Sequence, residues 1–162
     1  MKLLTPGQAH ELDRVSMGDM GISTEKLMGN AGKQVAKEAM EMVSDIHDSS
    51  ILILCGKGNN GGDGFAAATV LFENNYNVRI HSLCKNNVIK GDSLNFYLKC
   101  ESLGIFTTFG ELLADFKIPD LIIDGLLGTG FKGALRKSMT PWVEWINNSK
   151  SLRGISLLVS AS

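Results

Sequence analysis

A nine-residue segment, Gly56–Gly64, limits the folds open to this chain more than any other part of the sequence. It contains five glycines, two asparagines and one aspartate. The apolar run before it, Ile51–Cys55, is typical of a buried strand, and Phe65–Phe72 after it is typical of a helix. Glycine leaves backbone N–H groups bare, and the dipole of a following helix favours an anion there. The segment therefore predicts a strand, a ligand-binding turn and a helix that starts at Asp63, a good N-cap residue.

Two common nucleotide-binding motifs fit this segment only in part. Gly56, Gly58 and Gly61 satisfy the G-x-G-x-x-G spacing, but Val78–Lys85 lacks the acidic residue that would hold the ribose hydroxyls. A P-loop would need Gly-Lys-Ser/Thr after the glycines, which this segment lacks. An ordinary NAD-dependent dehydrogenase and a P-loop kinase are therefore disfavoured. A plain glycine-rich turn is the simplest alternative.

Strand-like and helix-like segments alternate after residue 50, and the strand-like runs are almost wholly apolar. Such runs are typical of parallel strands covered by helices on both faces. We predict a single α/β domain over residues 1–162, a three-layer Rossmann-like sandwich with a mostly parallel central sheet and an N-terminal helical arm. The expected strands are 51–55, 77–83, 105–108, 120–124 and 154–159. The expected helices are 5–17, one capped by Ser23 or Thr24, one from Asp63, one capped by Asp92, 110–116 and one opened by Thr140-Pro141.

A second glycine-rich segment, Asp124–Arg136, follows another apolar strand. A carboxylate at the end of such a strand is unfavourable unless it meets a ligand, a cation or hydrogen-bond donors. The segment also offers bare glycine amides and two cations suited to phosphate, Lys132 and Arg136. Open α/β sheets bind ligands beyond the carboxyl ends of their strands. Two such segments in one sheet therefore predict a phosphate-bearing ligand.

The composition disfavours several other classes of protein. The formal net charge is −1 and no basic stripe is present, so neither nucleic acid nor a membrane surface is an expected partner. No apolar run reaches membrane-spanning length. The three cysteines, Cys55, Cys84 and Cys100, have no C-x-x-C spacing. We expect reduced, mostly buried thiols and a reducing, cytoplasmic compartment.

Three motifs together resemble the NAD(P)H-hydrate epimerase family, whose domain is of the YjeF N-terminal type. Leu27–Gly32 is similar to the family's L-M-E-N-A-G, with Gly29 in place of the glutamate. Gly58–Gly64 matches the family's most characteristic segment, and Asp120–Gly130 resembles its D-x-I-I-D-A-L-F-G-T-G. The resemblance implies a Rossmann-like isomerase that acts on hydrated NADH or NADPH, with a hydrate dehydratase as a fused domain or partner.

The resemblance also implies roles for individual residues. Asn60, Asp124 and Ser162 would supply oxygens to a potassium ion, and Asn30 would lie near the mouth of the site. The implied substrate-binding residues are Asn59, Asn60, Gly61, Gly62, Asp63, Gly128, Thr129, Gly130, Phe131, Lys132, Gly133 and Ala134.

Epimerisation of the hydrate requires acid–base chemistry at a hemiaminal carbon. Loss of hydroxide leaves an iminium, and water then returns to either face. A carboxylate suits both proton transfers. Asp63 and Asp124 are the predicted catalytic residues, with a helix cap as the alternative role for Asp63.

The C-terminal segment departs from the family. The family ends its last strand here with D-I-P-S-G, and Val159 stands where the aspartate is expected, while Ser162 could match the serine. We therefore expect a shortened or variant domain that binds NAD(P)-like ligands but epimerises the hydrate poorly. The alternative is a catalytically deficient relative that binds a nucleotide or a protein on the same scaffold. The helical arm, Trp142 and Trp145 offer apolar surface for a homodimer.

Overall fold

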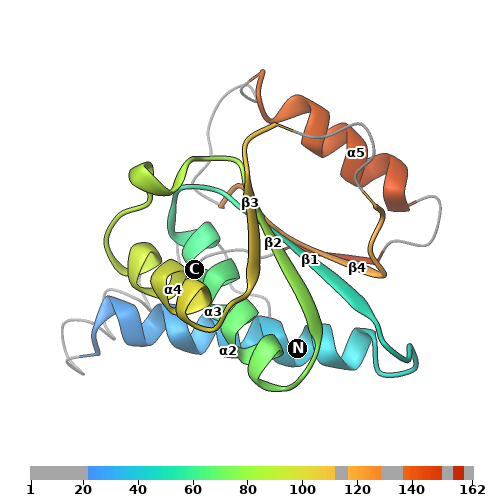
Figure 1. Ribbon diagram of the computed structural model, residues 1–162, viewed down its shortest axis with the longest axis horizontal. Coiled ribbons are helices and arrows are strands. Elements are labelled where there is room, and N and C mark those ends of the chain that lie inside the picture. The colour runs from blue at the N-terminus through green and yellow to red at the C-terminus, as the bar shows by residue number, and fades with distance from the viewer. Residues whose placement is uncertain (1–21, 112–116, 129–136, 151–154, 159–162) are drawn as a thin grey trace, which may run out of the picture.

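The computed structural model describes residues 22–111, 117–128, 137–150 and 155–158. Within these ranges the chain forms a five-stranded sheet in the order β3-β2-β1-β4-β5, and all four strand pairings are parallel. Helices α2, α3 and α4 cover one face of the sheet and α5 covers the other (Figure 1). This arrangement confirms the predicted three-layer α/β sandwich.

The strands lie close to their predicted positions. They are β1 Ser50–Cys55, β2 Asn77–Ser82, β3 Phe106–Phe109, β4 Leu121–Gly125 and β5 Ile155–Leu158. The helices are α2 Thr24–Met42, α3 Asn59–Glu73, the short 3₁₀ helix η1 Asn86–Val88, α4 Asp92–Ser102 and α5 Thr140–Lys150. The predicted helix 5–17 lies outside the described residues, as does most of the predicted helix 110–116.

Strand β1 is the middle strand of the sheet, and its side chains are buried on both faces. Ile51, Ile53 and Cys55 belong to the core shared with α2, α3 and α4. Leu52 and Leu54 face the opposite core, which contains Trp142 of α5. This alternation explains why the strand is a continuous apolar run rather than an alternating one.

Two helices begin at residues other than the predicted ones. Helix α3 begins at Asn59 with Gly58 as its N-cap, so Asp63 lies inside the helix and does not cap it. Helix α4 begins at Asp92, but its N-cap is Gly91, whose φ of 60° is a left-handed conformation that glycine adopts without strain. In contrast, Ser23 caps α2 as predicted, and its hydroxyl accepts a hydrogen bond from the Lys26 amide at 3.2 Å.

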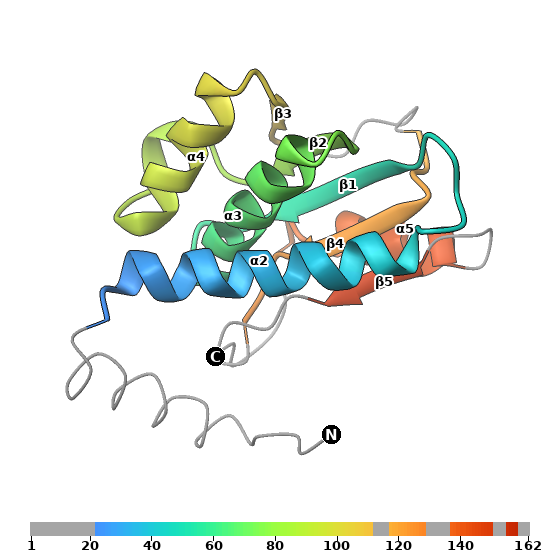
Figure 2. The same cartoon turned by 90° about the horizontal axis from the view of Figure 1, so that it is seen from below.

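Helix α2 runs along α3 on the outer side of the molecule (Figure 2). A Cβ atom on Gly32 would lie 2.4 Å from the Ala66 Cβ atom, so only glycine allows the two helices to approach this closely. The packing of α2 therefore places Leu27–Gly32, the first family-like motif, against the start of α3.

The cysteines and Trp142 lie in or close to the two cores. The three cysteines are free thiols, with Cys55 and Cys100 buried and Cys84 half-buried, as predicted. Trp142 does not offer surface for a dimer, because it is fully buried and its ring stacks on His81 with a centroid distance of 4.2 Å. Among the helices that the structure describes, none combines the length and apolar character that crossing a bilayer requires.

Candidate functional site

The two glycine-rich segments leave neighbouring strands at the same edge of the sheet. Leu54 of β1 pairs with Asp124 of β4, and Cys55 pairs with Gly125. The Gly56 amide then donates a hydrogen bond to the Gly125 carbonyl at 3.0 Å. The carboxyl ends of β1 and β4 are therefore side by side, where open α/β sheets bind ligands.

Three glycines shape the junction between β1 and α3. A Cβ atom on Gly56 would lie 2.4 Å from the Leu126 carbonyl oxygen, and one on Gly61 would lie 2.0 Å from the Gly56 carbonyl oxygen. A Cβ atom on Gly58 would have no neighbour within 4 Å. Gly56 and Gly61 thus allow close packing, whereas Gly58 leaves open space at the N-terminus of α3. These are the roles of the three glycines in the dinucleotide-binding fingerprint.

The predicted glycine-rich turn is in fact largely the first turns of α3. Gly61, Gly62 and Gly64 are all helical residues. A Cβ atom on Gly62 would lie 2.5 Å from the Met28 Sδ and Ser93 Oγ atoms, so α2 and α4 both press against this turn. The glycines serve contact with neighbouring elements, which explains why the helix tolerates residues that disfavour it.

Asn60 joins the two glycine-rich segments directly. Its side chain is 4% exposed, and Nδ2 donates a hydrogen bond to the Leu127 carbonyl at 2.5 Å. Its Oδ1 atom would lie 3.1 Å from a Cβ atom on Gly128. Asn60 therefore sets the spacing between the start of α3 and the loop after β4.

The two predicted catalytic carboxylates lie on the two connected segments. Asp63 is 4% exposed and lies one helical turn after Asn60, on the same face of α3. Asp124 is half-buried at the end of β4, and its Oδ1 atom accepts a hydrogen bond from the Leu126 amide at 3.0 Å. The topology therefore brings both carboxylates to the edge of the sheet where the segments meet.

The remaining predicted site residues are only partly described. Asn59 is exposed at the first position of α3, Gly61 and Gly62 are buried, and Gly128 is half-buried. Asn30 is exposed on α2. The predicted residues that lie outside the described ranges are Thr129, Gly130, Phe131, Lys132, Gly133, Ala134, Val159 and Ser162.

The donor atoms at this edge suit a hard cation in their chemistry. Asn60 Oδ1 and the Asp124 carboxylate are oxygen ligands, and the Asn60 backbone carbonyl oxygen would lie 2.9 Å from a Cβ atom on Gly125, the residue after Asp124. No cluster of three or more histidine, cysteine or acidic residues that could hold a metal occurs in the described part of the chain. Asn60 and Asp124 thus lie on two segments that are in contact, and the third implied potassium ligand, Ser162, falls outside the described ranges.

His81 is a buried residue near this edge that the sequence did not single out. Its Nε2 atom lies 3.0 Å from the Gly110 carbonyl oxygen and its Nδ1 atom 2.8 Å from the Thr108 hydroxyl. Burial lowers the pKa of the imidazole, although the hydrogen bond to Gly110 acts in the opposite direction. The alternation of apolar residues in β2 could have placed His81 on the α5 face, but it does not reveal these partners.

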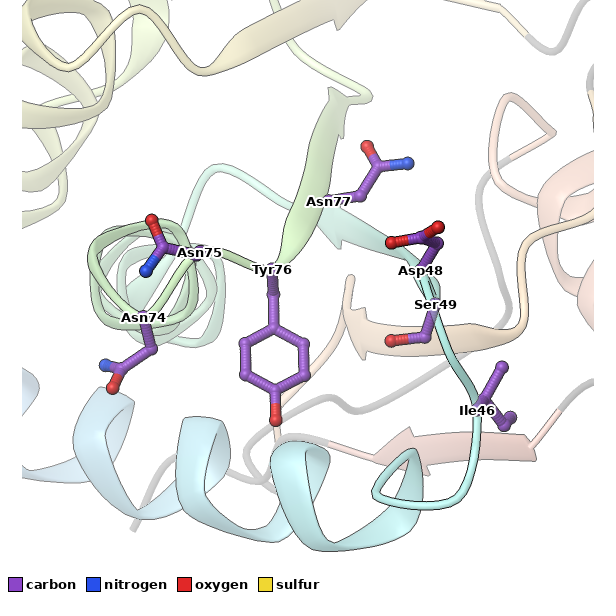
Figure 3. Close-up of a pocket in the computed structure, with 7 residues that line it drawn as sticks. All are labelled: Ile46, Asp48, Ser49, Asn74, Asn75, Tyr76 and Asn77. Atoms are coloured by element: carbon purple, nitrogen blue, oxygen red, sulfur yellow. The ribbon is translucent and has the colours of Figure 1, made fainter.

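A surface pocket of about 400 Å³ lies at the other end of the sheet. It is formed where the turns before β1 and β2 meet, so it is remote from the carboxyl ends of the strands (Figure 3). Two of its residues, Asp48 and Asn75, have positive φ angles, as turns require. The lining residues are Ile46, Asp48, Ser49, Asn74, Asn75, Tyr76 and Asn77.

Comparison with known proteins identifies relatives over most of the chain. The model of the family described as YjeF-related protein N-terminus matches residues 24–159. An NAD(P)H-hydrate epimerase of Rhodopirellula baltica is 35% identical over 93% of this chain, which spans 62% of that protein. A second, from Elusimicrobium minutum, is 29% identical over 94% of this chain and 72% of its own length.

A longer bifunctional enzyme and a solved structure are also similar to this chain. The bifunctional NAD(P)H-hydrate repair enzyme Nnr of Moorella thermoacetica is 34% identical over 92% of this chain, which spans 30% of that protein. The crystal structure of yeast ynu0 superposes with a TM-score of 0.83 at 20% identity, covering 98% of this chain and 70% of the yeast chain. The structural match supports the same arrangement of strands and helices.

Proposed function

This chain belongs to the family described as YjeF-related protein N-terminus, and from that premise we propose that it interconverts the R and S forms of hydrated NADH or NADPH. The observation that carries the proposal is the hydrogen bond from Asn60 to Leu127. This bond connects the two family-like glycine-rich segments, which supports a single site formed by both. The names of the relatives support the reaction, and this contact supports its location.

The substrate would lie across the carboxyl ends of β1 and β4. Gly58 leaves the N-terminus of α3 accessible, where backbone N–H groups and the helix dipole favour an anionic group. The loop that starts at Gly128 would bind the pyrophosphate from the other side. Potassium would be held by Asn60, Asp124 and Ser162, and it would supply positive charge next to the substrate.

Asp63 and Asp124 are the proposed acid–base groups. Protonation of the departing hydroxyl breaks the carbon–oxygen bond and leaves an iminium, and removal of a proton from water lets the new bond form on either face. Burial of Asp63 inside α3 supports this role over that of a helix cap, because α3 already begins at Asn59. A buried carboxylate is retained more readily where it has a function or a partner.

The activity test couples the protein to a dehydratase that consumes only the S form of the hydrate. Pure R hydrate should be consumed when this chain is present, but more slowly than by a family member that has the aspartate in place of Val159. Asp63→Asn and Asp124→Asn should each lower the rate by about 10²–10⁴-fold. The exposed Asp45 provides the matched control, and Asp45→Asn should leave the rate unchanged. A folded wild-type chain without turnover would instead support the nucleotide-binding alternative.

Potassium binding is tested separately by thermal unfolding. A ligand that binds only the folded state raises the unfolding temperature by mass action. Potassium should raise it more than sodium does, and Asn60→Ala should abolish the difference. Equal responses to both cations in the wild type would count against the site.

The longer relatives bear on the biological setting. Bifunctional repair enzymes carry the matching region as about 30% of their length. This arrangement supports a second activity, such as the dehydratase, acting on the product of this domain.

A further inference from the structure

The loop between β2 and α4, Leu83–Gly91, is fastened at both ends to the β1–α3 junction. At its start, the Leu83 amide donates a hydrogen bond to the Cys55 carbonyl at 3.1 Å. Just after its end, the Ser93 hydroxyl donates one to the Gly58 carbonyl at 3.4 Å. The loop therefore borders the open space at Gly58 where a dinucleotide would meet the N-terminus of α3.

This loop is cationic and carries no acid. Lys85 and Lys90 are exposed, and neither makes an ion pair with any residue in the described ranges. No aspartate or glutamate occurs between Asn74 and Gly91. The next acid, Asp92, accepts a hydrogen bond from the Thr24 hydroxyl. Both ammonium groups are thus available to an anionic ligand.

The loop follows β2 at the carboxyl end of the sheet, and this position indicates which part of a dinucleotide the charge would contact. In dinucleotide-binding folds, the end of the second strand contacts the ribose of the adenosine half. An acid there binds the 2′-hydroxyl, whereas a nearby arginine accommodates a 2′-phosphate. Lysine also binds phosphate, as a point charge. Here β2 lies next to β1 in parallel register, and the residues that follow it include Lys85 instead of an acid.

We propose that Lys85 and Lys90 determine specificity by binding the 2′-phosphate, so that the chain prefers hydrated NADPH to hydrated NADH. This inference rests on the proposed function for the identity of the substrate. It is tested first by binding, which does not depend on turnover. Adenosine 2′,5′-bisphosphate should bind more tightly than adenosine 5′-monophosphate in calorimetry, and its affinity should fall more steeply with salt.

Substitution of the lysines sharpens the binding test. Each exposed charge contact is worth up to about fivefold in affinity. Lys85→Ala and Lys90→Ala should each weaken the bisphosphate by about that factor, with little change for the monophosphate. The double variant should bind the two ligands equally. Lys37→Ala, an exposed lysine on α2, is the matched control and should behave as the wild type. Equal binding of both ligands by the wild type, or no binding of either, would overturn the proposal.

Turnover gives an independent measurement. The ratio of kcat/KM for the NADPH hydrate to that for the NADH hydrate should exceed one in the wild type and approach one in the double variant, chiefly through KM. A ratio that the double variant leaves unchanged would overturn the inference while leaving the epimerase function intact. Absence of turnover with both hydrates, together with preserved selectivity for the bisphosphate, would instead refute the proposed reaction alone.

Discussion

Asp120 directly precedes strand β4, and Asp124 is its second-last residue. The two carboxylates accept hydrogen bonds from different kinds of partner. Asp120 Oδ2 accepts hydrogen bonds from the Ser50 amide and hydroxyl, both at 2.8 Å, across a sequence separation of 70 residues. The hydrogen bond from Leu126 to Asp124 spans only two residues. Asp120 thus joins β4 to β1, whereas this bond of Asp124 is local to its own turn.

The two ends of the sheet are therefore held together by different means. The amino end relies on a side chain that bonds to a neighbouring strand. The carboxyl end relies on close backbone approach at Gly56 and Gly61, together with the amide of Asn60. Close backbone packing leaves side chains available at the edge of the sheet, and this is the edge where a ligand would bind.

The largest effect should come from adding one methyl group at the carboxyl end. In Gly61→Ala the new Cβ atom would lie 2.0 Å from the Gly56 carbonyl oxygen, so the backbone must shift. We expect the free energy of unfolding to fall by about 3 kcal/mol or more, measured by urea denaturation. Gly58→Ala, with no atom within 4 Å of the new Cβ, should lower it by less than about 1 kcal/mol. Similar losses in both variants would mean that backbone flexibility, and not close packing, explains these glycines.

Removing the Asn60 amide should have the next largest effect. Asn60→Ala leaves the Leu127 carbonyl without its donor, and it should lower the free energy of unfolding by about 1–3 kcal/mol. Asn59→Ala removes an exposed amide one residue earlier and should be nearly neutral. Chemical denaturation of the two variants measures the difference. If they are equally stable, the carboxyl end does not depend on this bond.

At the amino end, Asp120→Ala should lower the free energy of unfolding by about 1 kcal/mol at pH 7. The hydrogen bonds from the Ser50 amide and hydroxyl lower the pKa of Asp120 below its usual value. Its contribution is therefore present above the unfolded pKa of about 3.9 and is lost as pH falls through the lower folded pKa. Wild type and Asp120→Ala should converge in acid, in urea titrations at pH 7, 4 and 2. A constant difference across this range would exclude the ionised carboxylate as the cause.

The smallest effect should come from His81. Burial lowers its pKa, so the unfolded state binds the proton more readily. The contribution of the neutral imidazole to the free energy of unfolding is therefore fully present above the unfolded pKa of about 6.5. This contribution declines as pH falls toward the folded pKa. Between pH 7 and pH 6 the free energy of unfolding should decline by at most about 0.7 kcal/mol, the limit set by the unfolded pKa alone. His81→Asn should remove this slope, whereas substitution of the exposed His47 should retain it. An unchanged slope in His81→Asn would assign the pH dependence elsewhere.

The sequence predicted the strands well because of where they lie. β1, β2 and β4 each begin and end within one residue of prediction. β1 and β4 are almost fully buried, so their limits are visible as the limits of an apolar run. β2 carries Arg79 and His81, and its limits follow instead from the turn residues Asn74 and Asn75 before it and from the alternation of Val78 and Ile80. The topology rule for parallel sheets then placed the two glycine-rich segments at one edge, which the Asn60–Leu127 bond confirms.

The features that were missed depend on contacts between distant residues. Gly61 and Gly62 were predicted to form a turn, but packing on Gly56, Met28 and Ser93 makes them helical. Tertiary packing here overrides the low helix propensity of glycine. The bond of Asp120 to Ser50 is likewise invisible in local sequence patterns, because the two residues are 70 positions apart. The roles of Asp63, Asp124 and the potassium ligands remain predictions.

The central position of β1 also sets the order in which the chain can assemble. β1 pairs with β2, which follows it closely in sequence, and with β4, where Ile51 meets Leu121. Closing that longer loop requires more chain entropy to be lost, so we expect β1, α3 and β2 to form first and β4 to join later. Asn60 can meet Leu127 only after this late step. A bound nucleotide should therefore slow unfolding and leave the folding rate nearly unchanged, as stopped-flow kinetics with and without ligand would measure.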